Sequence, residues 1–223
     1  MSASYPVRAR TTDLGGILNL RRIATGFFVL LLAGCAAVQP ISDADRKKVS
    51  SVAISAEVRK PPAMFYLGPG GATGLMFGAI GGALSAGSIE ESRKSFQQYV
   101  DKNGISIEKI VFEEVSAALR QSGKFPLAAS PQPGGAVLVI SIVQYGFSIP
   151  HGFSSELVPI LGVRCELKDA SGKLLWSAQE HTRPLGNPVE SSKPDAIRND
   201  PKAMEGSWRA AAKHIAATIA AGY

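Results

Sequence analysis

Histidines and the serines near them are the residues of this chain best suited to catalysis or metal binding. The chain holds three histidines: His151, His181 and His214. No two of them stand four residues apart, the spacing at which a helix presents two imidazoles to one metal ion. A serine hydrolase can nevertheless assemble its triad from distant residues. His151 or His181 could therefore act as the base for one of three nearby serines: Ser154, Ser155 or Ser177.

Other catalytic patterns are weaker still. The glycine-flanked serine elbow of α/β-hydrolases does not occur in the sequence. Glu90–Glu91 and Glu113–Glu114 are adjacent acidic pairs, and neighbouring residues on a helix point apart, so we expect solvated carboxylates rather than an acid/base dyad. His214 is expected on the surface of the last helix. We predict that the protein is not an enzyme, with no catalytic residues, no cofactor and no metal, and keep a hydrolase as the lesser alternative.

The two cysteines, Cys35 and Cys165, occupy very different settings. Cys165 alternates with charged neighbours, which places its thiol on the apolar side of a strand and predicts a buried, unreactive side chain. Cys35 follows a basic stretch closed by Arg21-Arg22, an apolar run over 23–32, and the small residues Ala33-Gly34. That run is too short for an ordinary membrane-spanning helix and has the length of a signal-peptide core.

The segment Leu32-Ala33-Gly34-Cys35 resembles the bacterial lipobox. The resemblance implies a lipoprotein signal peptide over 1–34, and a Cys35 that carries acyl chains, palmitate among them, as the first residue of the mature lipoprotein. Ala36 then favours, by resemblance to Gram-negative lipoproteins, an outer-membrane protein that faces the periplasm. The membrane lipid around this anchor would be the first partner of the protein.

The net charge of +6 comes partly from this leader. Residues 1–34 hold four arginines and a single aspartate, so about half of the positive charge belongs to the leader. No run of lysines and arginines with interleaved aromatic residues follows it. We therefore expect no nucleic-acid partner.

Residues 61–89 contain no charged side chain. Within them four glycines stand four residues apart, and on a helix they would form nearly one line: Gly70, Gly74, Gly78 and Gly82. This repeat resembles the glycine zipper, in which small residues let a second helix approach closely. Residues 71–89 could thus form a helix that packs within the membrane or between copies. A glycine-rich loop packed on the protein's own surface remains the alternative.

The rest of the sequence predicts an α+β fold. We expect a first strand over 49–55, a helix over 106–121 that stops at Gly123, a short strand after it, and a buried strand over 136–147. A hairpin of 158–168 and 173–179, a loop over 183–201 and a last helix starting at Asp200-Pro201 follow. The sheet would be mixed or antiparallel, with four to five strands packed by two helices. The domain plan is a tether over 35–48 and an α/β envelope domain over 49–223, with a glycine-rich apolar insertion over 61–104.

This order of elements resembles small envelope lipoprotein domains related to the TolB N-terminal domain and the curli-secretion lipoprotein. Residues 169–176 and 121–125 carry most of the likeness. It implies a role in envelope assembly or transport, without fixed catalytic residues. We predict a lipid-anchored, non-catalytic binding or assembly module of the cell envelope, with an envelope protein or a second copy as partner. The alternative is an accessory lipoprotein of an envelope transport system, or, less favoured, an envelope hydrolase.

Overall fold

The computed structural model describes the backbone of residues 39–69 and 78–223, and the side chains of these ranges except those of 78–88. The predicted signal peptide over 1–34, the lipidation site Cys35, and two of the four repeat glycines, Gly70 and Gly74, lie outside the described residues.

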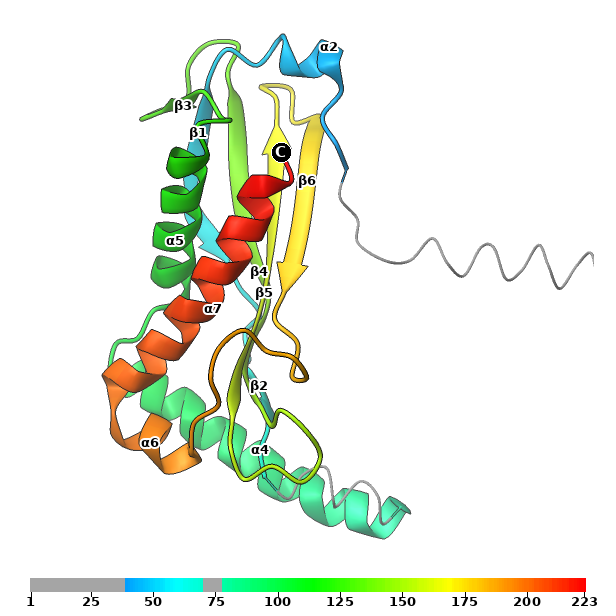
Figure 1. Cartoon of the computed structure of the whole chain (residues 1–223), viewed down its shortest axis with the longest axis vertical. Helices are drawn as coiled ribbons and strands as arrows, with labels where there is room; N and C mark the ends of the chain where they lie inside the picture. The colour runs from blue at the N-terminus through cyan, green and yellow to red at the C-terminus, as the bar shows by residue number, and fades with distance from the viewer. Residues whose placement is uncertain (1–38, 70–77) are drawn as a thin grey trace, which may run out of the picture. The chain divides into compact units, whose positions relative to one another are not determined.

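A mixed sheet organises the domain (Figure 1). Its six strands are β1 (Val52–Arg59), β2 (Phe65–Leu67), β3 (Leu127–Ala128), β4 (Ala136–Ser148), β5 (Val158–Lys168) and β6 (Leu174–His181). Their order is β3-β1-β4-β5-β6, and β2 pairs with the end of β4. The pairs β1–β3, β1–β4 and β2–β4 are parallel, whereas β4, β5 and β6 form an antiparallel meander.

The helices complete an α+β fold, as predicted. They are α2 (Asp43–Arg46), α4 (Gly78–Lys102), α5 (Ile107–Ser122), α6 (Pro194–Asn199) and α7 (Pro201–Ala221). The long helices α5 and α7 pack against each other and on one face of the sheet, as Figure 1 shows. No helix within 39–69 and 78–223 has both the length and the apolar character needed to cross a bilayer.

Local signals set the ends of these two long helices where the sequence placed them. The Ser106 hydroxyl accepts a hydrogen bond from the Lys109 amide at 3.2 Å, and Gly123 ends α5 in the left-handed conformation at φ 63°. The Asp200 carboxylate accepts from the Lys202 amide at 2.9 Å, and Pro201 opens α7. Both boundaries confirm the predictions.

Several element boundaries differ from the sequence expectations. The first strand runs to Arg59 rather than Ser55, because a bulge lets β1 resume pairing with β4 at Val58. The loop over 183–201 contains α6, whose Ile197 is buried. Helix α4 continues past Ile89 to Lys102, because Phe96 and Val100 are buried in the core. These two side chains tie the helix to the domain.

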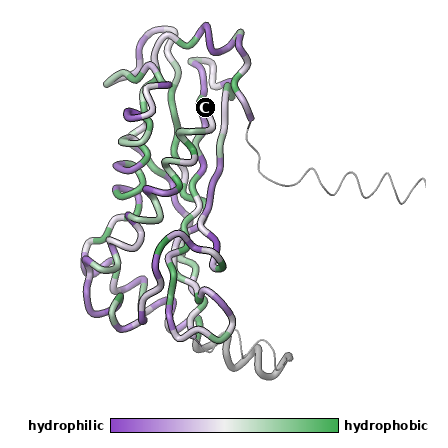
Figure 2. Tube along the Cα trace, viewed as in Figure 1, coloured by the Kyte–Doolittle hydropathy of each residue, from purple (hydrophilic) through white to green (hydrophobic). Residues whose placement is uncertain are grey.

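The core lies between the sheet and the α5–α7 layer. Over 136–142 of β4 and 163–167 of β5 every second side chain is buried in it, including Leu138, Ile140, Val163 and Cys165. The hydropathy trace in Figure 2 shows the resulting hydrophobic stretches along the central strands and hydrophilic residues on α2. Aromatic side chains close the end of the core near β2. Trp208 stacks on Phe147 with ring centroids 5.2 Å apart.

The segment before β1 is part of the folded domain from Gln39 onward. Gln39 forms an isolated antiparallel bridge with Ser177 of β6, and Ile41 is only 8% exposed. Lys173 then bonds Asp45 of α2 at 3.2 Å. Gln39, the first described residue, stands four positions after Cys35 in the sequence.

Candidate binding surface

The histidines and serines of the hydrolase alternative make no direct side-chain hydrogen bond to one another in the described part of the chain. Ser177 and His181 lie four residues apart on β6, roughly 13 Å along an extended strand. In the β4–β5 loop the Ser154 hydroxyl accepts from the Glu156 amide at 3.0 Å, and the Ser154 amide donates to the His151 carbonyl at 3.0 Å. No hydrogen bond among the described residues joins a histidine imidazole to a serine hydroxyl. His214 is exposed, as predicted.

Metal-ligating side chains do not gather in the described part of the chain. Across the described ranges, no group of three or more histidine, cysteine, aspartate or glutamate side chains is placed to hold an ion. Cys165 is fully buried and unpaired, which confirms the sequence prediction. Burial raises the pKa of its thiol to about 12. The side chain is therefore a protonated core residue at neutral pH rather than a nucleophile.

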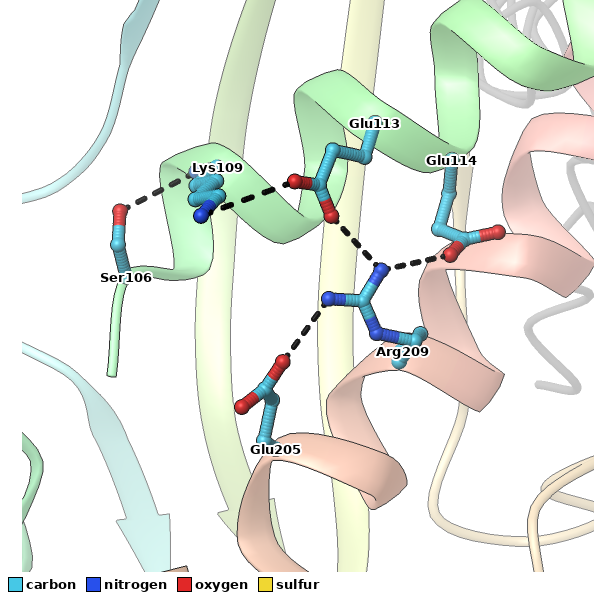
Figure 3. Close-up of polar contacts among 6 residues, drawn as sticks. All are labelled: Ser106, Lys109, Glu113, Glu114, Glu205 and Arg209. Atoms are coloured by element: carbon cyan, nitrogen blue, oxygen red, sulfur yellow. Dashed lines mark hydrogen bonds and ion pairs between the residues drawn. The ribbon is translucent and has the colours of Figure 1, made fainter. Parts of the chain in front are cut away.

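The prediction that Glu113 and Glu114 are merely solvated is wrong. Both carboxylates bond the Nη1 atom of Arg209 on α7, at 2.9 Å and 3.0 Å, and Glu205 bonds Nη2 at 2.9 Å (Figure 3). The hydrogen bonds that Arg209 donates to the carboxylates of Glu205, then Glu113 and Glu114, raise the pKa of Arg209 above its usual value. The packing of α7 beside α5 supplies the cation that the sequence pattern does not reveal. This arginine cluster connects the two helices and is structural.

The sheet face opposite α5 and α7, which we call the open face, is the candidate binding surface. Alternating residues of β5 present Arg164, Glu166 and Lys168 on it, at positions that the sequence predicted to point away from the core. The Arg164 Nε donates to Gln179 of β6 at 2.8 Å, and Lys168 pairs with Glu166 at 2.8 Å. This open face therefore carries a polar band along the last part of β5 and the neighbouring part of β6.

Near β2, the open face contains a hollow of about 370 Å³, which we call the open-face groove. It is lined by Phe65, Val143, Gln144, Ile160, Gln179, His181, Thr182, Arg183 and Pro184. Two strand glycines make room for it. Gly146 lies directly under the backbone of Phe65, and a side chain on Gly162 would meet Val143 and the Cβ atom of His181.

The groove combines an apolar floor with a basic rim. Phe65 and Val143 are 38% and 37% exposed, which is unusual for large hydrophobic side chains in the described part of this chain. The Thr182 hydroxyl is already used, because it donates to the Pro159 carbonyl and accepts from the Leu161 amide, each at 3.0 Å. Arg183 and His181 are exposed at the rim, and no carboxylate belongs to the lining. Such an arrangement suits a binding partner that has both an apolar part and an anionic part.

Sequence reasoning missed this groove. Its exposed apolar side chains come from β2 and β4, and its basic rim comes from the end of β6 and the loop after it. The available signal was a glycine within each of two strand patterns, at 146 and 162, because an isolated strand glycine marks a bulge or a close backbone approach. The predicted helix-packing residues Gly78 and Gly82 lie on α4, one turn apart.

Comparisons with known proteins give resemblances only. No protein-family model matches the chain, and no curated protein matches it. Among solved structures, it is similar to the PelC dodecamer from Paraburkholderia phytofirmans, at 15% identity and a TM-score of 0.38 over 85% of this chain and 98% of that one. It is also similar to protein XCC0632 from Xanthomonas campestris, at 14% identity and a TM-score of 0.36 over 51% of this chain and 58% of that one.

Proposed function

We propose that this chain is a lipid-anchored lipoprotein of the bacterial cell envelope that acts as a non-catalytic binding or assembly module. The observation that carries the proposal is the lipobox-like Leu32–Cys35 segment, which stands four positions before Gln39, a residue bridged to the sheet. Several acyl chains hold a protein firmly on a membrane, whereas one chain binds only marginally. Ala36 favours the outer membrane, with the domain on the periplasmic side.

Assembly would use the first half of α4. Gly78 and Gly82 stand one turn apart on this helix, and Ala86 continues the line of small residues. A row without bulky side chains lets a second helix approach closely, and this packing does not need charged groups. The partner would be a second copy of the chain or another envelope protein.

Fatty-acid labelling tests the anchor. Cells that express the protein with a clickable fatty acid should label the wild type, and the Cys35→Ala variant should lose the label and leave the membrane fraction. Cys165→Ala is the matched control, because it removes the other cysteine and should keep the label. Persistent label on Cys35→Ala, with continued membrane association, would exclude the lipoprotein assignment.

Cross-linking in intact envelopes tests the assembly role. The Gly78→Leu/Gly82→Leu double variant should lose most cross-linked oligomer or partner, because two leucines block close helix approach. Gln98→Leu adds a leucine to an exposed position of the same helix and should leave the products unchanged. Equal yields from the double variant and the wild type would contradict the assembly role of α4. Reproducible recovery of inner-membrane components instead would favour an accessory lipoprotein of a transport system.

A further inference from the structure

Gln39 is held on the outer edge of β6. The Gln39 amide donates to the Ser177 carbonyl at 2.9 Å, and the Ser177 amide donates to the Gln39 carbonyl at 3.1 Å. Ile41 is buried two residues later, and α2 follows at once. Gln39 is thus a fixed point of the folded domain, held on the strand that borders the open-face groove.

The proposed anchor cannot be far from this fixed point. Only residues 36–38 separate Cys35 from Gln39. A fully extended chain advances at most about 3.6 Å per residue, so the two Cα atoms lie within about 14 Å of each other. This step rests on the proposed function, because it matters only when Cys35 carries the lipid. In that case the membrane surface must pass close to the β6 edge.

The backbone direction at Gln39 points toward one end of that edge. The bridge between Gln39 and Ser177 is antiparallel, so at Gln39 the direction toward the N-terminus is the direction in which β6 runs from Ser177 to His181. Gln179 and His181 lie roughly 7 and 13 Å beyond Ser177 along the strand, within the reach of the anchor. Both residues line the open-face groove.

The surface at that end has the composition of a membrane contact. Two exposed hydrophobic side chains, Phe65 and Val143, line the groove, and Leu185, which is 79% exposed, directly follows its lining residue Pro184. Arg183 and the nearby Arg164 supply positive charge, and Arg164 is bonded to the neutral Gln179 rather than to a carboxylate. Apolar side chains beside basic ones suit the boundary between acyl chains and anionic headgroups.

We propose that the open-face groove and Leu185 rest on the anionic headgroup layer of the membrane that holds the Cys35 anchor. The short connection limits how far the domain can lie from the membrane, and the groove supplies the surface that would face it. Helices α5 and α7, on the opposite face of the sheet, then point away from the bilayer. The lipid surface, rather than a protein partner, is the occupant of this face.

Fluorescence quenching in vesicles tests the orientation. The full-length lipoprotein would be purified from membranes and reconstituted in vesicles of phosphatidylethanolamine and phosphatidylglycerol that contain lipids spin-labelled near the headgroup. A thiol-reactive fluorophore would be placed, one site at a time, in Leu185→Cys, Lys47→Cys and Lys109→Cys. Cys165 is buried and Cys35 is blocked by its lipid, so only the new thiol reacts.

We expect severalfold stronger quenching at position 185 than at position 109 on α5, with position 47 on α2 intermediate or unquenched. Adding Arg183→Glu to the Leu185→Cys protein should reduce the quenching, whereas Glu113→Gln, on the far side of the sheet, should not. Vesicles of phosphatidylcholine alone should also give weaker quenching, because they lack the anionic headgroup.

The result separates this inference from the proposed function. Fatty-acid label on Cys35 together with equal quenching at 185 and 109, or stronger quenching at 47 than at 185, would overturn the orientation and leave the lipoprotein assignment standing. No fatty-acid label on Cys35 would remove the proposed function instead, and the distance argument with it. Unchanged quenching in the Arg183→Glu protein would exclude the charge contact.

Discussion

The indole of Trp208 on α7 donates a hydrogen bond to the carbonyl of Gly146 on β4, with Nε1 and O 3.1 Å apart. Gly146 also pairs with Phe65 of β2 and adopts φ 144°, a conformation that side chains rarely allow. One backbone position therefore joins the helix layer, the central strand and the short strand beside the groove. Its substitution is the sharpest available test of this part of the fold.

Gly146→Ala should strongly destabilise the domain. A Cβ atom there would collide with the backbone carbonyl of Phe65, and the positive φ adds strain. We expect a loss of about 2–4 kcal/mol in the free energy of unfolding, measured by denaturant titration. Gly152→Ala is the control, since nothing lies within 4 Å of its added methyl group. Similar losses in the two variants would contradict the close approach of β2 to β4.

Ile41→Ala should loosen the segment that holds Gln39 on β6. Removing this buried side chain should cost about 2 kcal/mol or more, and hydrogen exchange at the Ser177 amide should become faster as the bridge opens. Leu185→Ala truncates an aliphatic side chain that is 79% exposed and should change stability by less than about 0.5 kcal/mol. Unchanged exchange at Ser177 in the Ile41 variant would show that this segment is not needed to hold the bridge.

Arg209→Met should weaken the contact between α5 and α7. The variant keeps the aliphatic stem and leaves Glu113, Glu114 and Glu205 without their shared cation. Because the arginine is partly exposed, we expect a loss of only about 1 kcal/mol, smaller in high salt. Lys109→Met is the control, since its pair with Glu113 is at 4.0 Å and exposed. Thermal unfolding at low and high ionic strength measures the stability loss of each variant. Equal losses would show that Arg209 stabilises the helix pair no more than Lys109 does.

Cys165 should make the domain less stable at alkaline pH. Burial raises the thiol pKa from 9.0 to about 12, so the unfolded chain loses this proton first as the pH rises. The stability is fully present below pH 9 and should fall by roughly 1.4 kcal/mol per pH unit between 9 and 12 through this group. Other groups titrate in the same range, so the measurement is the difference between wild type and Cys165→Ala.

That difference should shrink as the pH rises, because the alanine variant has no thiol to ionise. Its cavity costs the same free energy at every pH. A difference that stays constant from pH 8 to 11 would show that the Cys165 thiol ionises as readily in the folded protein as in the unfolded chain.

The sequence by itself determined the elements whose signals are local. The Ser106 cap, the Gly123 stop and the apolar stripe between them define α5, and Asp200-Pro201 defines the start of α7. Alternation along β5 placed Cys165 inside and its charged neighbours outside, as the structure has them. These features follow from backbone preferences and side-chain periodicity within a few residues, which is why no distant contact was needed to predict them.

Only the tertiary structure decided how distant segments meet. The pairing of β2 with β4 and the extension of β1 past its bulge depend on neighbouring strands rather than on their own sequence. Glu113 and Glu114 gain their cation from a helix that lies far along the chain. The open-face groove likewise needs β2, β4, β5 and β6 side by side, with glycines at the crossing points. Because four strands contribute to the groove, the periodicity of no single strand predicts it. Only the strand glycines at 146 and 162 indicate it in the sequence.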